Sequence, residues 1–186
     1  MALGWKNTIT RYGLVSIICH WLMLFLIVAT YVTINLKSTF PKGSASRETI
    51  VICHYMFGLS VFGLVWLRLW ARSAGVHPAV EPALPAYQTL LVKVMHLALY
   101  ALMIGLPLLG WLLLSAKGKP VMILGGELPA LIDKSRETAK LLKDIHETGA
   151  TIGYYLIGLH AIAALYNHYV KRDNTLRLML PGLTSN

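Results

Sequence analysis

Three histidines, His146, His160 and His168, lie in one apolar stretch with the sequence DIHETGATIGYYLIGLHAIAALYNHY (144–169). An ionisable ring is costly inside a membrane, so residues of this kind are functional candidates. Neutral imidazole is a common axial ligand of haem iron, and it also binds ions such as Zn²⁺. These rings could therefore hold a redox cofactor, bind a metal ion, or form hydrogen bonds between neighbouring helices.

Four apolar runs indicate that the chain is embedded in a membrane. The 186 residues are 56% hydrophobic and 13% charged, whereas soluble domains are about 45–50% apolar. The runs lie at about 14–36, 49–72, 90–116 and 146–170, and each approaches or exceeds the roughly 20 residues needed to cross a bilayer. We therefore predict an all-α membrane protein, a single domain over 1–186 that forms a four-transmembrane-helix bundle. The first run is too long for a signal peptide and is expected to be retained.

The basic composition is explained by the membrane. The formal net charge is +9, but the basic residues flank the apolar runs, where anionic lipid and topology account for them without a nucleic-acid partner. No Cys-x-x-Cys-His motif is present, so covalent haem attachment is not encoded. Cys19 and Cys53 should lie at opposite depths and are expected to be buried free thiols.

The distribution of basic residues predicts the orientation. Four spans place both termini on one side, which carries eight of the seventeen Lys and Arg residues; six of the other nine lie in the long 117–145 connection. Because the positive-inside rule weights short segments near the spans, we predict cytoplasmic termini. The second connection contains three prolines and a solvated His77. Residues 131–145 are expected to form a short amphipathic helix on the membrane surface, or else a plain solvated linker.

Position along each span predicts the depth of each histidine, at about 1.5 Å per residue. His146 and His160 are 14 residues apart, which is roughly 21 Å of rise and about 40° short of four full turns, so both rings point the same way. Matching these two depths on other spans predicts two haems, each held by two imidazoles. The outer level contains His54 and His146, and the inner level leaves His20, His96 and His160 as candidates.

Small residues share helix faces with these histidines. Gly58, Gly149 and Ala164 follow His54, His146 and His160, respectively, by three or four positions, so a flat macrocycle could lie close to the backbone. A bare zinc site would need four clustered ligands, and the outer level offers two histidines. A metal transporter or a structural anchor without redox function is the alternative from another class, and it would give a colourless preparation.

Motifs over nearly the whole chain resemble the bacterial cytochrome b561 family, the four-helix membrane cytochromes with two b haems that include superoxide oxidases. The resemblance covers the segments ITRYG, ICHWL, ICHYMFG, MHLALYALMIGLPLLGW, SAKGKP, IHETG, IGLHAIAALYNHY and KRDNTLRLMLPG. It implies a multi-pass protein of the bacterial inner membrane that carries two non-covalent b haems.

The resemblance also implies which histidines are haem ligands. Carried onto this sequence, the axial ligands are His20 with His160 on the cytoplasmic side and His54 with His146 on the outer side. The resemblance thus resolves the inner pair against His96. The family binds ubiquinone, which makes His168 the candidate for the quinone contact. His96 is a second candidate, for the quinone or for a hydrogen bond at the haem edge.

The resemblance implies a superoxide oxidase, which passes electrons from superoxide through the haems to ubiquinone. Basic residues of the outer connections could raise the encounter rate of this anion, or could simply be solvated or paired with haem propionates: Lys37, Lys42, Arg47, Lys117 and Lys119. The alternative is a membrane cytochrome b subunit that exchanges electrons between quinone and a periplasmic redox partner, with residues 131–145 as its docking segment.

Overall fold

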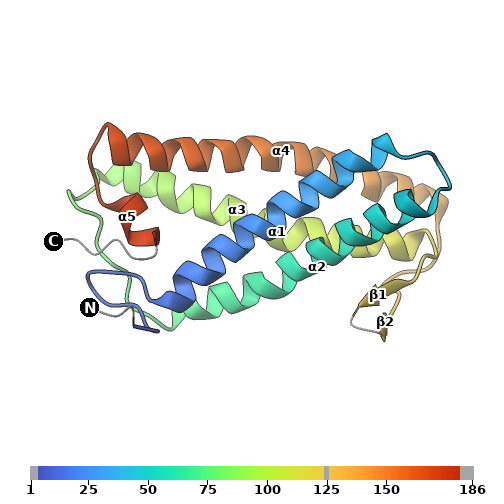
Figure 1. The fold of residues 1–186 in the computed structure, drawn as a ribbon, viewed down its shortest axis with the longest axis horizontal. Coiled ribbons are helices and arrows are strands. Elements are labelled where there is room, and N and C mark those ends of the chain that lie inside the picture. Colours follow the sequence, from blue (N-terminus) through green and yellow to red (C-terminus); the bar gives the residue numbers. More distant parts are fainter. Residues whose placement is uncertain (1–3, 124–125, 181–186) are drawn as a thin grey trace. The chain divides into compact units, whose positions relative to one another are not determined.

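Four long helices dominate the computed structural model, which describes residues 4–123 and 126–180 (Figure 1). Each of the four is long and apolar enough to cross a membrane, so the all-α, four-span prediction is confirmed. Short elements fill the connections and the tail. In chain order the helices are α1 (Leu14–Leu36), η1 (Lys37–Thr39), α2 (Ala45–Ser73), α3 (Ala86–Ala116), α4 (Arg136–Tyr169) and α5 (Thr175–Met179).

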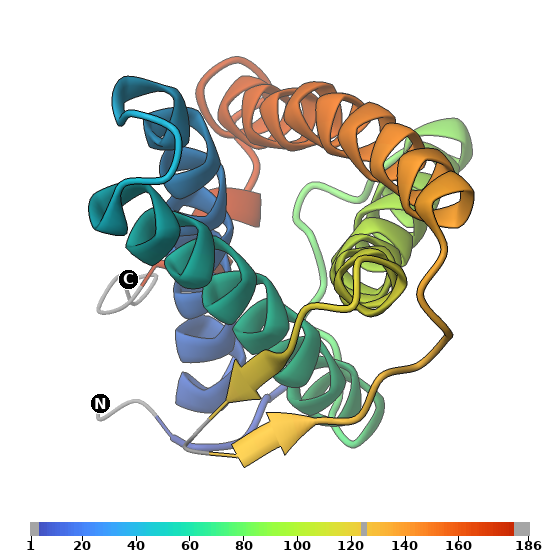
Figure 2. The same cartoon turned by 90° about the vertical axis from the view of Figure 1, so that its right-hand side faces the viewer.

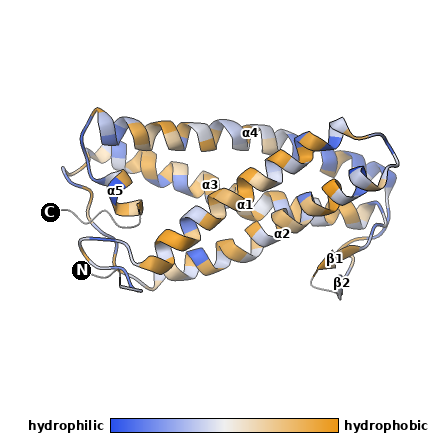
Figure 3. Cartoon of the chain, in the orientation of Figure 1, coloured by the Kyte–Doolittle hydropathy of each residue, from blue (hydrophilic) through white to orange (hydrophobic). Residues whose placement is uncertain are grey.

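Large apolar side chains on the long helices are exposed on the isolated chain. Phe25 is 63% exposed, Leu97 70% and Tyr155 75%, and hydrophobic residues run along much of α1, α2 and α3 (Figure 3). In water such surfaces would promote aggregation. In a bilayer they contact lipid tails, which are as apolar as leucine. The exposed apolar faces are therefore suited to contact with lipid.

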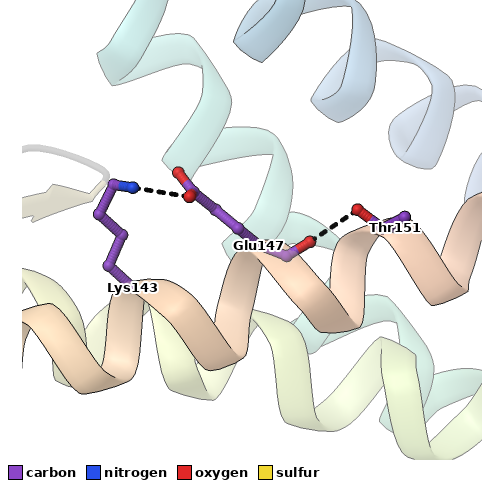
Figure 4. Close-up of polar contacts among 3 residues, drawn as sticks. All are labelled: Lys143, Glu147 and Thr151. Atoms are coloured by element: carbon purple, nitrogen blue, oxygen red, sulfur yellow. Dashed lines mark hydrogen bonds and ion pairs between the residues drawn. The ribbon is translucent and has the colours of Figure 1, made fainter.

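Helix α4 begins ten residues earlier than the apolar run predicts. Residues 136–145 are not a separate surface helix, because α4 is continuous from Arg136 to Tyr169. Across the expected boundary, Lys143 Nζ lies 2.6 Å from Glu147 Oε2, and Thr151 Oγ1 donates to the Glu147 carbonyl oxygen at 3.0 Å (Figure 4). No glycine or proline interrupts 136–148, so nothing ends the helix at the membrane boundary.

A small hairpin lies in the connection between α3 and α4, where the sequence indicates only turns. Strands β1 (Val121–Ile123) and β2 (Gly126–Leu128) pair antiparallel, with Val121 opposite Leu128 (Figure 2). The segment after β2 returns to α3, because Trp111 Nε1 donates to the Pro129 carbonyl oxygen at 3.1 Å.

The contacts of the chain cluster in two compact units, and each long helix contributes to both. The terminal unit consists of 4–24, 64–100 and 154–180, and the hairpin unit of 25–63, 101–123 and 126–153. In the terminal unit, the tail is tied to other segments. Asn174 Oδ1 accepts a hydrogen bond from the Glu81 amide at 2.9 Å, and Trp21 Nε1 donates to the Met179 carbonyl oxygen at 2.7 Å.

Three residues predicted to lie outside the site match their predictions, except that Cys53 is less buried than expected. His77 is exposed in the non-helical connection between α2 and α3, and its Nδ1 lies 3.2 Å from the Gly75 carbonyl oxygen. Both cysteines are free thiols, and Cys19 is buried whereas Cys53 is half-buried.

Candidate functional site

One pair of histidines lies in the hairpin unit. His54 on α2 and His146 on α4 have ring centroids 6.3 Å apart, with an angle of 75° between the ring planes. His54 Nδ1 is 2.9 Å from the Thr30 carbonyl oxygen of α1. A carbonyl only accepts, so this bond places the ring proton on Nδ1 and leaves the lone pair of Nε2 free. Metal-binding histidines are held in this way.

The separation of these rings fits two imidazoles on one iron. A metal–imidazole bond is about 2.0–2.1 Å, and a ring nitrogen lies about 1.1 Å from its ring centre, so two trans imidazoles have centres roughly 6.3 Å apart. The angle between the planes is not restrictive, because each ring can rotate about its bond to the metal. His146 also has a buried Nδ1 without a hydrogen-bond partner among the described residues.

The glycines around this pair serve different purposes. A Cβ added at Gly58 would meet no atom within 4 Å, so the backbone is not covered by another side chain there. At Gly149 a Cβ would lie 2.8 Å from Leu106 Cδ2, so this glycine instead accommodates a side chain of α3. The sequence analysis missed Gly110 of α3, where a Cβ would lie 3.4 Å from His146 Cε1.

Three histidines meet in the terminal unit: His20 of α1, His96 of α3 and His160 of α4. The ring centroids of His20 and His160 are 6.4 Å apart, close to the spacing derived above. Those of His96 and His160 are 5.5 Å apart, which is too short for the same arrangement. His96 Nδ1 lies 2.7 Å from the Val92 carbonyl oxygen of its own helix, a contact of the same kind as that of His54, so the ring separation is the feature that distinguishes His96 from His20. The geometry favours His20 with His160.

Arg68 contacts the His20 ring, and the sequence analysis did not anticipate this contact. Nη2 of Arg68, on α2, lies 3.1 Å from His20 Nδ1. The sequence feature that could have indicated this contact is an arginine inside an apolar run, five residues before α2 ends at Ser73. Such a residue in a span usually has a specific partner.

His168 lies apart from these pairs, in the last turn of α4. Its Nδ1 is buried and has no hydrogen-bond partner among the described residues. The Tyr169 ring lies beside it, with centroids 4.9 Å apart. The preceding residue, Asn167, is buried, and its Oδ1 accepts a hydrogen bond from Gln88 Nε2 of α3 at 3.0 Å. Polar groups therefore gather around this end of α4 within the terminal unit.

The chain matches the sequence profile of the prokaryotic cytochrome b561 family over residues 11–182. The chain belongs to this family. It is therefore a multi-pass bacterial membrane protein of electron transfer, and membership in the cytochrome b561 family implies haem b. Within 4–123 and 126–180, no three His, Cys, Asp or Glu side chains converge as ligands of a metal ion, and the pairs described above suit the two axial positions of a haem.

Named relatives of this cytochrome b561 protein extend over nearly its whole length. "Cytochrome b561 homolog 1" of Escherichia coli (strain K12) is 38% identical over 92% of this chain and 97% of its own length. "Probable superoxide oxidase CybB" of Yersinia pestis is 30% identical over 92% of this chain and 96% of its own. "Cytochrome b561 homolog 2" of Escherichia coli (strain K12) is 28% identical over 96% and 95%, respectively.

Proposed function

We propose that this chain is a superoxide oxidase that holds two b haems and passes electrons from superoxide to ubiquinone. The observation that carries the two-haem part is the pair of ring separations, 6.3 Å for His54 with His146 and 6.4 Å for His20 with His160. The superoxide part is supported by the relative named probable superoxide oxidase, which is 30% identical to this chain.

The four histidines would fill both axial positions of each haem, one pair in each unit. When bound, haem b supplies an iron that changes its charge by one electron, while the chain supplies ligation and electrostatics. If both histidines of a pair bound the same iron, they would leave no position for O₂. The site is therefore suited to electron transfer.

Lysines of the hairpin unit support the proposal that the electron donor is an anion. The pKa of Lys117 is lowered, mainly by partial removal from water and further by the charges of Lys119, Lys143 and Lys37. Lys143 forms an ion pair with Glu147, so Lys117, Lys119 and Lys37 supply the local positive charge. A positive cluster raises the encounter rate of an anion such as superoxide. With cytoplasmic termini, as proposed from the basic residues, this cluster faces outward.

His168 is the proposed quinone contact in the terminal unit. Its buried Nδ1, which has no hydrogen-bond partner among the residues that the structure describes, could form a hydrogen bond to a quinone carbonyl oxygen. In the overall reaction, two superoxide anions each lose one electron and leave as O₂. One quinone gains these two electrons and two protons and becomes quinol. An imidazole ring has one nitrogen that donates and one that accepts, so it is suited to a hydrogen bond with a quinone oxygen.

Haem content and superoxide reactivity of the purified protein test this function. We expect two b haems per chain by the pyridine haemochrome assay. They should become reduced when a superoxide-generating system is added under air and reoxidised by a soluble ubiquinone. Superoxide dismutase should abolish the reduction, which excludes direct transfer from the generating system.

Other outcomes would assign other functions. Two haems that superoxide does not reduce but quinol does would indicate a cytochrome b subunit that exchanges electrons with a periplasmic redox partner. If the purified protein is colourless and still binds no haem after haem is added, the two-haem assignment itself is contradicted.

A further inference from the structure

The two histidine pairs differ in the group that faces Nδ1 of one ring. In the hairpin unit, His54 Nδ1 lies 2.9 Å from the Thr30 carbonyl oxygen, which is an acceptor. In the terminal unit, His20 Nδ1 lies 3.1 Å from Nη2 of Arg68, which can only donate and is always charged. One ring therefore faces the negative end of a dipole and the other faces a fixed positive charge.

Within residues 4–123 and 126–180, no carboxylate forms an ion pair with Arg68. The terminal unit contains eight Lys and Arg residues but only two acids, Glu81 and Asp173. Asp173 is 3% exposed, and its carboxylate accepts hydrogen bonds from the amide and the hydroxyl of Thr175. Glu81 is exposed in the connection between α2 and α3. Over the described part of the chain, the one ion pair is Lys143–Glu147 of the hairpin unit.

The surroundings of Arg68 preserve the effect of its charge. The residue is half-buried in α2, and it interacts electrostatically with His160 and His96 as well as with His20. Within an apolar span the effective dielectric constant is lower than in water, so a charge acts more strongly on groups around it.

We infer that Arg68 makes the haem of His20 and His160 the higher-potential one of the two. Reduction of a haem iron removes one positive charge, so a nearby cation stabilises the reduced form. Arg68 can only donate, so His20 Nδ1 is the acceptor of this contact. If Nε2 bound the iron, Nδ1 would carry the ring proton and could no longer accept, so Arg68 would act through its charge and would leave the ring without the acceptor that makes an imidazole a stronger electron donor. At His54, donation to a carbonyl makes the imidazole more basic and favours the oxidised iron.

This difference gives electron flow a direction. The haem of the hairpin unit would be the better reductant and the haem of the terminal unit the better oxidant, so electrons would collect in the unit that contains His168. The inference rests on the proposed two-haem assignment, but it does not depend on whether the donor is superoxide.

A potentiometric titration of the haem absorbance in the purified holoprotein tests the role of Arg68. The wild-type chain should show two separate waves, and His54→Ala, which should keep the haem of His20 and His160, should retain the higher one. In Arg68→Gln, the reduced-to-oxidised ratio of that haem at a fixed potential should fall about tenfold, or about 59 mV for one electron. The other haem should change less than about twofold.

Two further variants separate charge from structure. Arg72→Gln removes a charge one helical turn further along α2, where no hydrogen bond to His20 is formed, and should produce a clearly smaller shift. Arg68→Lys keeps the charge and should leave the terminal-unit haem the higher one. Should Arg68→Gln purify without that haem, the order of potentials in Arg68→Lys decides the question.

The contradicting results are distinct from those that would refute the function. Equal shifts of both haems, no shift in Arg68→Gln, or a reversed order in Arg68→Lys would overturn the inference. Two haems with the expected order that do not react with superoxide would refute the superoxide proposal and leave the role of Arg68 intact.

Discussion

A histidine ligand is held in a fixed orientation when its second ring nitrogen donates to an acceptor, as His54 Nδ1 does to the Thr30 carbonyl oxygen. We predict that His54→Ala lowers the haem content from two to one per chain, because no other described histidine approaches His146 at the required spacing. The pyridine haemochrome assay on purified protein measures this. The control is His77→Ala, which removes an exposed loop histidine and should retain both haems. Full haem content in His54→Ala would contradict the assignment.

His96 tests the choice of ligands in the terminal unit. The 5.5 Å separation of His96 and His160 does not suit two ligands of one iron, whereas the 6.4 Å separation of His20 and His160 does. We expect His96→Ala to keep two haems and His160→Ala to keep one. Low-temperature absorption spectra of the remaining haem provide the measurement. If His96→Ala lost a haem and His20→Ala did not, the two residues would have to exchange roles.

Lys117 gives a prediction about pH. Because its pKa is lowered, this lysine loses its charge at a lower pH than an ordinary lysine. The neutral amine is the reactive form, so labelling of Lys117 by acetic anhydride should increase at a correspondingly lower pH. In Lys119→Gln a repelling charge is absent, the pKa should rise, and labelling near pH 8 should slow roughly twofold, as expected for exposed charges. Peptide mass spectrometry measures the rate, and equal rates in the two proteins would argue against a lysine cluster.

At the scale of helices, Gly153 is where α4 leaves room for a side chain of α1. A Cβ at this position would lie 2.5 Å from the Tyr31 hydroxyl oxygen, which is fixed by donating to the Ala150 carbonyl oxygen at 2.7 Å. We predict that Gly153→Ala destabilises the protein by about 1–3 kcal/mol through overpacking. Thermal unfolding in detergent measures the change.

The control for this substitution lies on the same helix. A Cβ at Gly158 would meet nothing within 4 Å, so Gly158→Ala should change stability by no more than about 1 kcal/mol, the difference in helix propensity. Similar losses in both variants would show that the glycines matter for the backbone of α4 and not for its contact with Tyr31.

Local sequence properties predicted the helices but not all of their boundaries. Apolar runs report the part of a helix that is in lipid, so four spans could be read directly. The first turns of α4 are polar and amphipathic, so hydropathy does not distinguish a separate surface helix over 131–145 from the beginning of the span. Continuity depends on the absence of a breaker and on contacts such as Lys143 with Glu147.

Helix periodicity likewise predicted the candidate ligands but not their surroundings. The 14-residue spacing on α4 placed His146 and His160 on one face. The acceptor for His54 is a backbone carbonyl, which carries no side-chain signal, and the Arg68 contact joins residues 48 positions apart. Both depend on how helices pack, and the choice between His20 and His96 depends on ring distances that spacing alone does not provide.

At the scale of the whole molecule, the direction of insertion determines which solution each histidine pair meets. We predict that the connection between α1 and α2 faces outward and the one between α2 and α3 faces the cytoplasm, because basic residues cluster near the span ends on the terminal side. Two exposed positions report on these connections, Ser38 and Val76. In a variant without Cys19 and Cys53, Ser38→Cys should react with a membrane-impermeant maleimide in intact spheroplasts. Val76→Cys should react only after the membrane is opened.

The reverse pattern would place the lysine cluster around Lys117 inside the cell. An external anionic donor could then not reach the hairpin unit, and the proposed superoxide chemistry would fail even if both haems were present.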